Sequence, residues 1–173
     1  MNHLINKGRA KPIKISKAFD ECLSLLLEEL RLAIQWNRPC ILLAVQPSHA
    51  GPNTAALALE KKLKKISQKI VHVNFKDDQF DISILTGLFP PQGDVIFFFS
   101  HLSQHHQEDD GMDIYRSLNL YRETFIENQI RAIFWLNTEE AADLPRCAPD
   151  FWVFRHRVVE FAPSRRPRLK PAD

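Results

Sequence analysis

An apolar run followed at once by a turn and an amphipathic segment constrains the fold of this chain more than any other feature. Residues 40–45 (C-I-L-L-A-V) form an unbroken apolar run, which is typical of a short buried strand. Turn-forming residues follow as far as Asn53, and apolar positions then recur at helical spacing from Ala56 to Leu63. A buried strand, a tight loop and a helix in this order predict a parallel sheet with helices packed on it. The same unit can hold a phosphate group at the N-terminus of its helix.

Strand-like and helix-like patterns alternate along the whole chain. The strand-like segments are residues 40–45, 69–75, 94–99, 131–136 and 157–161. The helix-like segments are residues 17–37, 53–67, 77–89, 112–129 and a short one for which Thr138 is the predicted N-cap. This alternation predicts a three-layer α/β/α domain with a five-stranded, mainly parallel sheet. We expect the domain to occupy residues 16–163, between a flexible basic segment at 1–15 and a basic, proline-rich tail or linker at 164–173.

The loop after the first strand has the spacing of the phosphate-binding loop G-x-x-x-x-G-K-[ST], but different residues fill it. Gln46 stands at the first glycine position, Gly51 at the second, Pro52 at the lysine position and Asn53 at the serine or threonine position. Proline has neither an amine that could contact a phosphate nor a backbone N–H to donate. We therefore predict a degenerate phosphate loop, made of Gln46, Ser48, Gly51, Pro52, Asn53 and Thr54.

A nucleotide-hydrolysing site of this kind also needs an acidic residue at the end of a second strand, where it holds Mg²⁺ or a water molecule. The candidate strand ends in Ser100 and His101, and a serine hydroxyl brings no negative charge to a hard divalent ion. Asn137 stands where such folds place a polar residue that senses the γ-phosphate, although a loop asparagine beside a helix cap explains it equally well. The loss of both the lysine and the acid predicts a protein that does not catalyse phosphoryl transfer.

Three histidines lie close together in the polar loop that follows the third strand-like segment. His101, His105 and His106 are followed by carboxylates, and this combination can build a metal site. No second His or Cys pair at ligand spacing occurs elsewhere in the sequence, so a solvated polar loop is favoured and no metal is predicted.

Charge is distributed unevenly between the ends and the body of the chain. Residues 1–17 carry five cations and no acid, and residues 164–173 carry a net +3, so the total of +2 leaves −6 for residues 18–163. An acidic body argues against a nucleic-acid-binding face, except through the basic tail. No apolar run approaches the ~20 residues that span a bilayer, so no membrane association is expected. Three scattered cysteines indicate reduced core thiols in a cytoplasmic protein.

The C-terminal third carries a resemblance to a known family. Its segments are L-N-L-Y-R-E-T-F (118–125), R-A-I-F-W-L-N-T-E-E (131–140) and C-A-P-D-F-W-V-F-R-H-R-V-V-E-F (147–161). Together they resemble degenerate STAND-type (signal-transduction ATPase) modules of bacterial multidomain proteins, where repeats usually follow the module. The resemblance implies an AAA-like sheet of strand order 5-1-4-3-2, no catalysis, a role in signalling or prokaryotic immunity, and a protein partner or adjacent domain. The residues to test in this block are Asp150, Trp152, Arg155 and Glu160.

Three functions remain open on the sequence alone. The first is a non-catalytic signalling or adaptor module that binds a protein partner and needs no cofactor. The second is a weak binder of ATP or ADP without turnover, because a helix starting near Asn53 still offers backbone N–H groups. The third is an enzyme that degrades NAD, because residues 93–101 (G-D-V-I-F-F-F-S-H) resemble the opening strand of TIR (Toll/interleukin-1 receptor) domains. Only 72 residues follow His101, which is too few for such a domain.

Overall fold

The computed structural model describes residues 17–47, 53–75, 95–102 and 114–161, and they form a five-stranded sheet between two layers of helices. All neighbouring strands are parallel, in the order β2-β3-β4-β1-β5. This confirms the predicted order 5-1-4-3-2, and β1 lies inside the sheet as expected. The strands are β1 (Cys40–Gln46), β2 (Lys69–Asn74), β3 (Val95–Ser100), β4 (Arg131–Asn137) and β5 (Arg157–Glu160).

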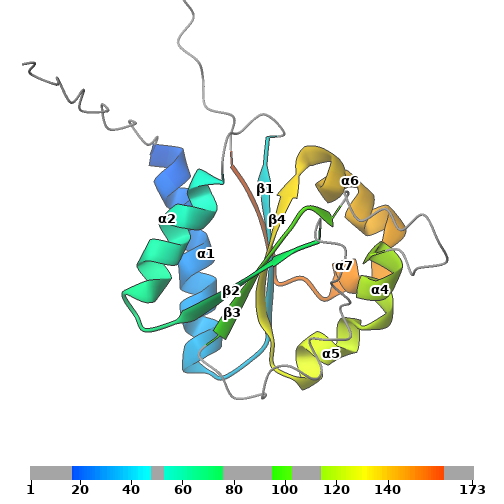
Figure 1. Ribbon diagram of the computed structural model, residues 1–173, viewed down its shortest axis with the longest axis horizontal. Helices are drawn as coiled ribbons and strands as arrows, with labels where there is room; N and C mark the ends of the chain where they lie inside the picture. The colour runs from blue at the N-terminus through cyan, green and yellow to red at the C-terminus, as the bar shows by residue number, and fades with distance from the viewer. Residues whose placement is uncertain (1–16, 48–52, 76–94, 103–113, 162–173) are drawn as a thin grey trace, which may run out of the picture.

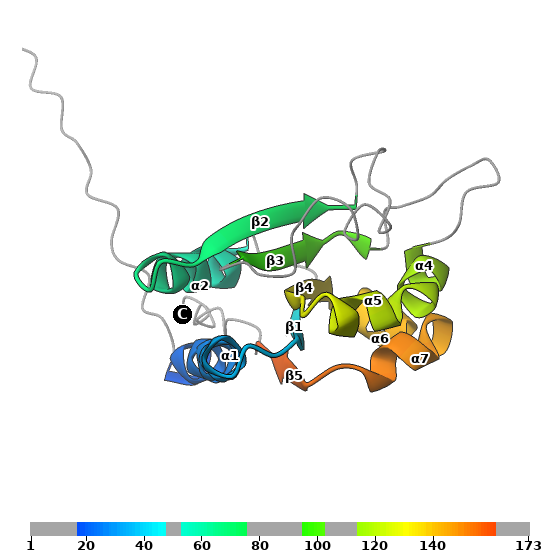
Figure 2. The same cartoon turned by 90° about the horizontal axis from the view of Figure 1, so that it is seen from below.

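Helices cover both faces of this sheet (Figures 1 and 2). One face carries α1 (Lys17–Gln35) and α2 (Thr54–Lys64). The other carries α4 (Ile114–Leu120), α5 (Arg122–Glu127), α6 (Thr138–Cys147) and α7 (Pro149–Val153). Parallel strands need crossover connections, and helices lying on both faces of the sheet bury the apolar side chains that point to either side.

The two faces of the sheet bury different kinds of core. Phe97 and Phe99 of β3 point to the α4–α7 face, whereas Phe98 between them points to the α1–α2 face, because side chains alternate along a strand. The α4–α7 face is rich in aromatic rings, among them Phe99 stacked on Phe134 with ring centroids 4.6 Å apart. The α1–α2 face is largely aliphatic, with leucines of both helices fully buried. This double burial explains the unbroken apolar runs of the central strands.

Three helices end on a residue other than glycine in the left-handed conformation. Asn37 (φ 44°) follows α1, Ser67 (φ 61°) follows α2, and Gln129 (φ 52°) follows α5. After α1, the N–H of Arg38 reaches back to the carbonyl of Ala33, at 2.9 Å, which is the hydrogen bond of a Schellman motif. This turn ends α1 at Gln35, slightly before the predicted end at residue 37.

The prediction of a single helix over residues 112–129 is wrong in one respect, because this segment forms two short helices, α4 and α5. The break falls at Tyr121, which leaves helical geometry at ψ 13° although its N–H still bonds to the carbonyl of Ser117. The apolar spacing continues across the break, so periodicity alone gave no sign of it. The helix predicted at 77–89 lies outside the described residues.

The edge strand β2 carries a histidine that pairs with the neighbouring helix. The Nε2 atom of His72 lies 3.1 Å from the Oε2 atom of Glu60 on α2, and its ring packs edge-on against Phe98. His72 therefore joins β2 to α2 at the rim of the core. Within the described part of the chain, no helix is both long and apolar enough to cross a bilayer.

The three cysteines are free thiols in different environments, and their reactivities should differ accordingly. Cys147 is exposed, which corrects the expectation that all three lie in the core. Burial, aided by the charge of Glu29, raises the pKa of the Cys40 thiol to about 12, so at mildly alkaline pH it stays protonated and unreactive.

We expect iodoacetamide to alkylate Cys147 first and Cys40 only after denaturant unfolds the protein, as peptide mass mapping over time would show. Native-state alkylation of Cys40 as fast as that of Cys147 would contradict this order.

Candidate functional site

The parallel strands bring the predicted site residues to one end of the sheet. Gln46 at the end of β1 lies in register with Asn137 at the end of β4. Ser100 at the end of β3 lies in register with Trp135, two residues before Asn137. Figure 1 shows the ends of β1 and β4 side by side, with α6 starting directly after β4. Ligands of open α/β sheets bind outside the carboxyl ends of the strands, so this end is the candidate site.

The side chain of Asn53 caps the helix that follows the predicted phosphate loop. Its Oδ1 atom accepts the N–H of Ala56 at 2.9 Å and also an N–H of the Gln46 side-chain amide at 2.7 Å. Asparagine is a favoured N-cap because its side-chain oxygen satisfies an N–H that the first turn leaves open. The Asn53 oxygen stands where the phosphate-loop pattern has its serine or threonine hydroxyl, and here it is engaged by the protein's own donors.

Only part of the predicted phosphate loop belongs to the described structure. Gln46 and Asn53 are both half-buried, and Thr54, the first residue of α2, is exposed. Ser48, Gly51 and Pro52 lie outside the described residues. The contact between Gln46 and Asn53 therefore links the two ends of the loop, one on β1 and one at the start of α2.

Asn137 is the N-cap of α6, which corrects the prediction that Thr138 has this role. Its Oδ1 atom accepts the N–H of Glu140 at 2.8 Å, and a carboxylate oxygen of Glu140 accepts the N–H of Asn137 at 2.9 Å. This is a capping box, which satisfies two helix-end donors at once. Glu140 is almost fully buried, at 3% exposure. The site residue with the predicted sensor position is therefore also a structural residue.

Ser100 and His101 occupy the position of the missing acid. His101 is exposed and lies in the left-handed region at φ 63°, where a side chain with a Cβ atom is disfavoured. Its Nδ1 atom is 3.1 Å from the hydroxyl oxygen of Ser100. Among the residues that the structure describes, no three His, Cys, Asp or Glu side chains come together as a metal site. His105 and His106 lie outside the described residues.

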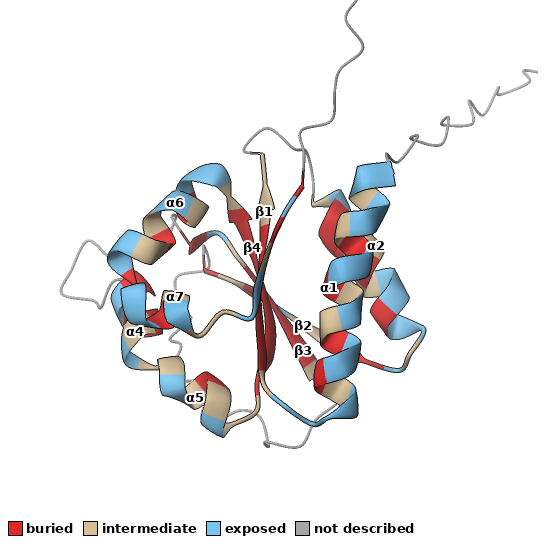
Figure 3. Ribbon diagram, turned by 180° about the vertical axis from the view of Figure 1, so that it is seen from behind, coloured by how far each residue is buried: buried red, intermediate tan, exposed pale blue. Residues whose placement is uncertain are grey.

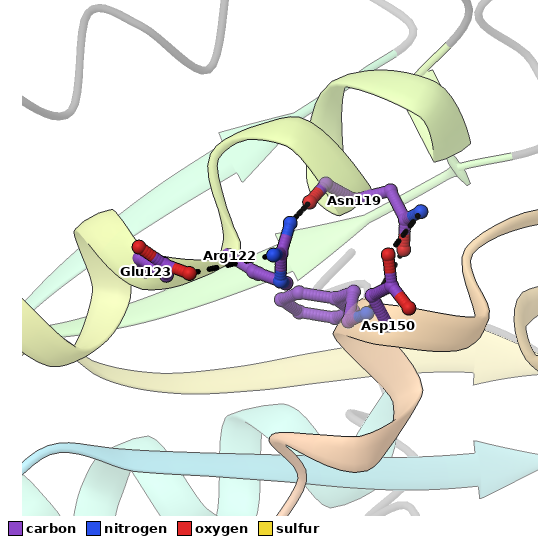
Figure 4. A network of polar contacts seen from close by, with 5 residues as sticks. Asn119, Arg122, Glu123 and Asp150 are labelled. Atoms are coloured by element: carbon purple, nitrogen blue, oxygen red, sulfur yellow. Dashed lines mark hydrogen bonds and ion pairs between the residues drawn. The ribbon is translucent and has the colours of Figure 1, made fainter.

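The block that carries the family resemblance is held together by Asn119 of α4 (Figure 4). The side-chain oxygen of Asn119 accepts the N–H of Phe151 at 3.0 Å, and its amide nitrogen donates to the carboxylate of Asp150 at 3.2 Å. Both bonds fix the first turn of α7, which begins with proline at its first position. Asn119 was not among the predicted site residues, because its partners lie about 30 positions away in the sequence.

Arg155 and Trp152 form a second contact in this block. The guanidinium carbon of Arg155 lies 3.8 Å from the centre of a Trp152 ring, which is a cation–π distance. The same guanidinium donates a hydrogen bond to the carbonyl of Trp152. Glu160, the last residue of β5, is exposed, and its backbone carbonyl accepts a hydrogen bond from the Cys22 thiol at 3.4 Å.

These site residues do not converge on one point. Gln46, Ser100 and Asn137 share the carboxyl end of the sheet, whereas Asp150, Trp152 and Arg155 lie in and beside α7 on the α4–α7 face. Sequence reasoning missed Glu140 and Asn119. The spacing N-T-E-E at 137–140 is a signal that could have revealed the capping box, because an N-cap residue is followed three positions later by glutamate.

Comparison with known proteins shows a shared fold. No protein-family model matches this sequence, and no curated protein matches it. The ORC2 protein of Aeropyrum pernix, solved as ADPNP–ADP complexes, is similar over 88% of this chain and 50% of that protein, with TM-score 0.56 and 10% identity. RuvB of Thermotoga maritima, a Holliday junction branch migration motor, is similar over 85% of this chain and 45% of that protein, with TM-score 0.51 and 14% identity. The chain thus spans about half the length of these structures, and it has the fold of P-loop NTPase-type proteins.

Proposed function

We propose that this chain is a non-catalytic NTPase-like module that acts by binding a protein partner or an adjacent domain in a signalling or adaptor role. Pro52 at the lysine position and Ser100 at the acid position remove the two charges that phosphoryl transfer needs. The observation that carries the proposal is the engagement of Asn53, whose Oδ1 atom is bonded to both Gln46 and Ala56. In this proposal, the polar groups of the degenerate site stabilise the fold rather than bind a substrate.

The engagement of Asn53 matters because the first turn of α2 is where a phosphate would bind. A helix N-terminus attracts anions through N–H groups that have no partner within the helix. The Asn53 side chain satisfies one of these groups, the N–H of Ala56, at 2.9 Å. A phosphate would have to compete with this cap without the help of a lysine amine. A role without nucleotide binding therefore fits the local chemistry better than weak nucleotide binding does.

The capping box of α6 supports the same proposal from a second strand end. A γ-phosphate sensor must present its polar side chain to the ligand, whereas the side-chain oxygen of Asn137 is bonded to the N–H of Glu140.

A bacterial cytoplasmic location and membership of the STAND-type group belong to the same proposal. The free thiols Cys22 and Cys40 support the location, and the resemblance of residues 118–161 supports the membership.

We expect that Mg-ATP and ADP do not raise the melting temperature of this protein and that ATP is not hydrolysed above the rate in buffer. A nucleotide bound by the folded state alone at 100 times its Kd would add about 2.7 kcal/mol of stability, which is easily measured. Differential scanning fluorimetry, isothermal titration and a phosphate-release assay would check the three statements.

The Gly51→Asp variant makes this experiment decisive, because a carboxylate in the loop would repel a phosphate. Heat or stabilisation that appears with ATP in the wild type and disappears in Gly51→Asp would favour the weak nucleotide binder instead. Magnesium-dependent phosphate release by the wild type would overturn the non-catalytic role altogether. NAD consumption by the wild type would favour the third function considered, the NAD-degrading enzyme.

A further inference from the structure

The outer surface of α1 carries a line of large apolar side chains that the fold leaves partly exposed. Leu25, Leu32 and Trp36 are exposed by 39%, 37% and 67%. Successive helical residues are ~100° apart, so positions 25, 32 and 36 lie within about 20° of one line along the helix. Trp36 follows the last residue of α1, but its N–H still bonds to the carbonyl of Leu32 at 3.0 Å, so it continues this line. We call these three residues the outer stripe.

The outer stripe is separate from the face by which α1 packs on the sheet. Leu23, Leu26, Leu30 and Ala33 make that inner face, and each is at most 1% exposed. A single exposed leucine is ordinary on a protein surface. Leucines seven residues apart, followed by tryptophan four residues later, have instead the spacing by which one helix packs against another. Figure 3 shows exposed and buried bands alternating along the ribbon of α1, as expected for a helix with one face in the core.

The outer stripe lies on the side of α1 that borders an open edge of the sheet. On this side, Glu29 pairs with Arg157 of β5 at 2.7 Å, and the Cys22 thiol donates to the Glu160 carbonyl. The strand β5 is last in the sheet order and pairs only with β1 among the strands that the structure describes. A partner on the outer stripe could therefore also lie along β5.

The charges around the outer stripe select the kind of partner. Glu28 is exposed and lies between Leu25 and Leu32 on the same side of the helix, and Glu21 lies one turn before Leu25. Helix α1 has four acids against two bases, and the chain from residue 18 to 163 carries −6. Lysine or arginine side chains that flank the apolar contacts of a partner would meet these carboxylates.

A second copy of this chain is a poor occupant of the same surface. Two α1 helices paired in parallel through the outer stripe would bring the same residues of the two copies opposite each other. Glu28 of one copy would then face Glu28 of the other, and Glu21 would face Glu21. Like charges in direct contact oppose association, whereas a basic helix turns the same carboxylates into attractive contacts.

We propose that the outer stripe is the docking site for a basic amphipathic helix of a protein partner. The helix would place apolar side chains against Leu25, Leu32 and Trp36 and cationic side chains against Glu21 and Glu28. Tryptophan is among the residues that contribute most of the binding energy at protein interfaces, so Trp36 would be the main contact. This inference specifies the partner of the proposed adaptor role, and its test is independent of any nucleotide measurement.

The test is a selection of displayed helical peptides, randomised at their apolar and flanking positions, on the full chain. A triple variant, Leu25→Ala, Leu32→Ala and Trp36→Ala, serves for counter-selection, and Leu120→Ala is the matched control because Leu120 is 56% exposed on α4. We expect the recovered peptides to have a leucine-like stripe flanked by lysine or arginine. Fluorescence anisotropy should show at least tenfold weaker binding to the triple variant, unchanged binding to Leu120→Ala, and weaker binding to Glu28→Lys.

Several outcomes would overturn the proposal. These are a selection that yields no stripe-dependent peptide, peptides with acidic flanks, and equal affinity for the wild type and the triple variant. Sedimentation that shows a dimer of the wild type and a monomer of the triple variant would assign the stripe to self-association instead. Stripe-dependent binding to neutral lipid vesicles would assign it to a membrane. Magnesium-dependent ATP hydrolysis would overturn the non-catalytic role but leave the stripe-dependent binding of a peptide intact, so the two failures can be told apart.

Discussion

Replacing Phe134 with alanine should lower the free energy of unfolding by about 3–5 kcal/mol. Phe134 lies in β4, the middle strand of the sheet, and its side chain is fully buried. Its ring is stacked on Phe99 at 4.6 Å and meets Phe151 edge-on at 5.2 Å, so the substitution leaves a cavity bordered by both strands and helices. Chemical denaturation followed by circular dichroism would measure the loss.

Two further variants keep this prediction informative. Natural domains are stable by only about 5–15 kcal/mol, so Phe134→Ala could leave too little folded protein to measure. Phe134→Leu removes less volume and should cost less than Phe134→Ala. Val153→Ala, at a side chain 74% exposed, should change the stability by no more than about 0.5 kcal/mol. A similar small effect for Phe134→Ala would mean that the aromatic cluster is not the core of this fold.

The sheet was predictable from the sequence because its strands are buried on both faces. Runs such as residues 131–136 contain almost no polar residue, and the helical segments between them force a parallel arrangement. The strand order is a different matter, because pairing depends on contacts far apart in the sequence. That order came from the resemblance of residues 118–161 to a known family, and the register of β1 beside both β4 and β5 confirms it.

The ends of helices were less predictable because they depend on which of several neighbouring side chains forms the capping hydrogen bond. Asn137 and Thr138 are adjacent and both are good N-caps. Only Asn137 is placed so that the Glu140 carboxylate can accept a hydrogen bond from its backbone N–H. The break at Tyr121 has no glycine or proline to mark it. In both places the sequence pattern allows two local structures with similar free energies, and tertiary packing selects one.

The candidate site was predictable in position but not in contacts. A loop after the first buried strand marks the carboxyl end of the sheet, and the structure places Gln46 at the end of β1 and Asn53 at the start of α2, on either side of that loop. The bond between their side chains depends on the distance between β1 and α2, which no spacing rule supplies. The Asn119 contacts to α7 are harder still, because they join residues 31 and 32 positions apart.

Phe151→Ala should also lower the free energy of unfolding by about 3–5 kcal/mol, which would show that the A-P-D-F-W segment (residues 148–152) has a structural role in filling the core. Phe151 is fully buried, and its ring meets Phe125 at 5.4 Å and Phe134 at 5.2 Å, both edge-on. The helix α7 has only five residues, too few to be stable by itself, so its position depends on this ring and on the Asn119 hydrogen bonds. Denaturation by guanidinium, followed by tryptophan fluorescence, would measure the loss.

The variant Trp152→Ala distinguishes a structural role of this segment from a ligand-binding role. Trp152 is only half-buried and stacks under Arg155, so Trp152→Ala loses part of a surface contact and should cost clearly less stability than Phe151→Ala. A ligand site would use the accessible side chain of Trp152, because a ligand cannot reach Phe151, so Trp152→Ala would then weaken ligand binding with little loss of stability. A Phe151→Ala protein as stable as the wild type would contradict the structural role of this segment. Because Phe151 contacts the ring of Phe134 directly, the double variant should lose less than the sum of the two single losses, as expected for residues that line one cavity.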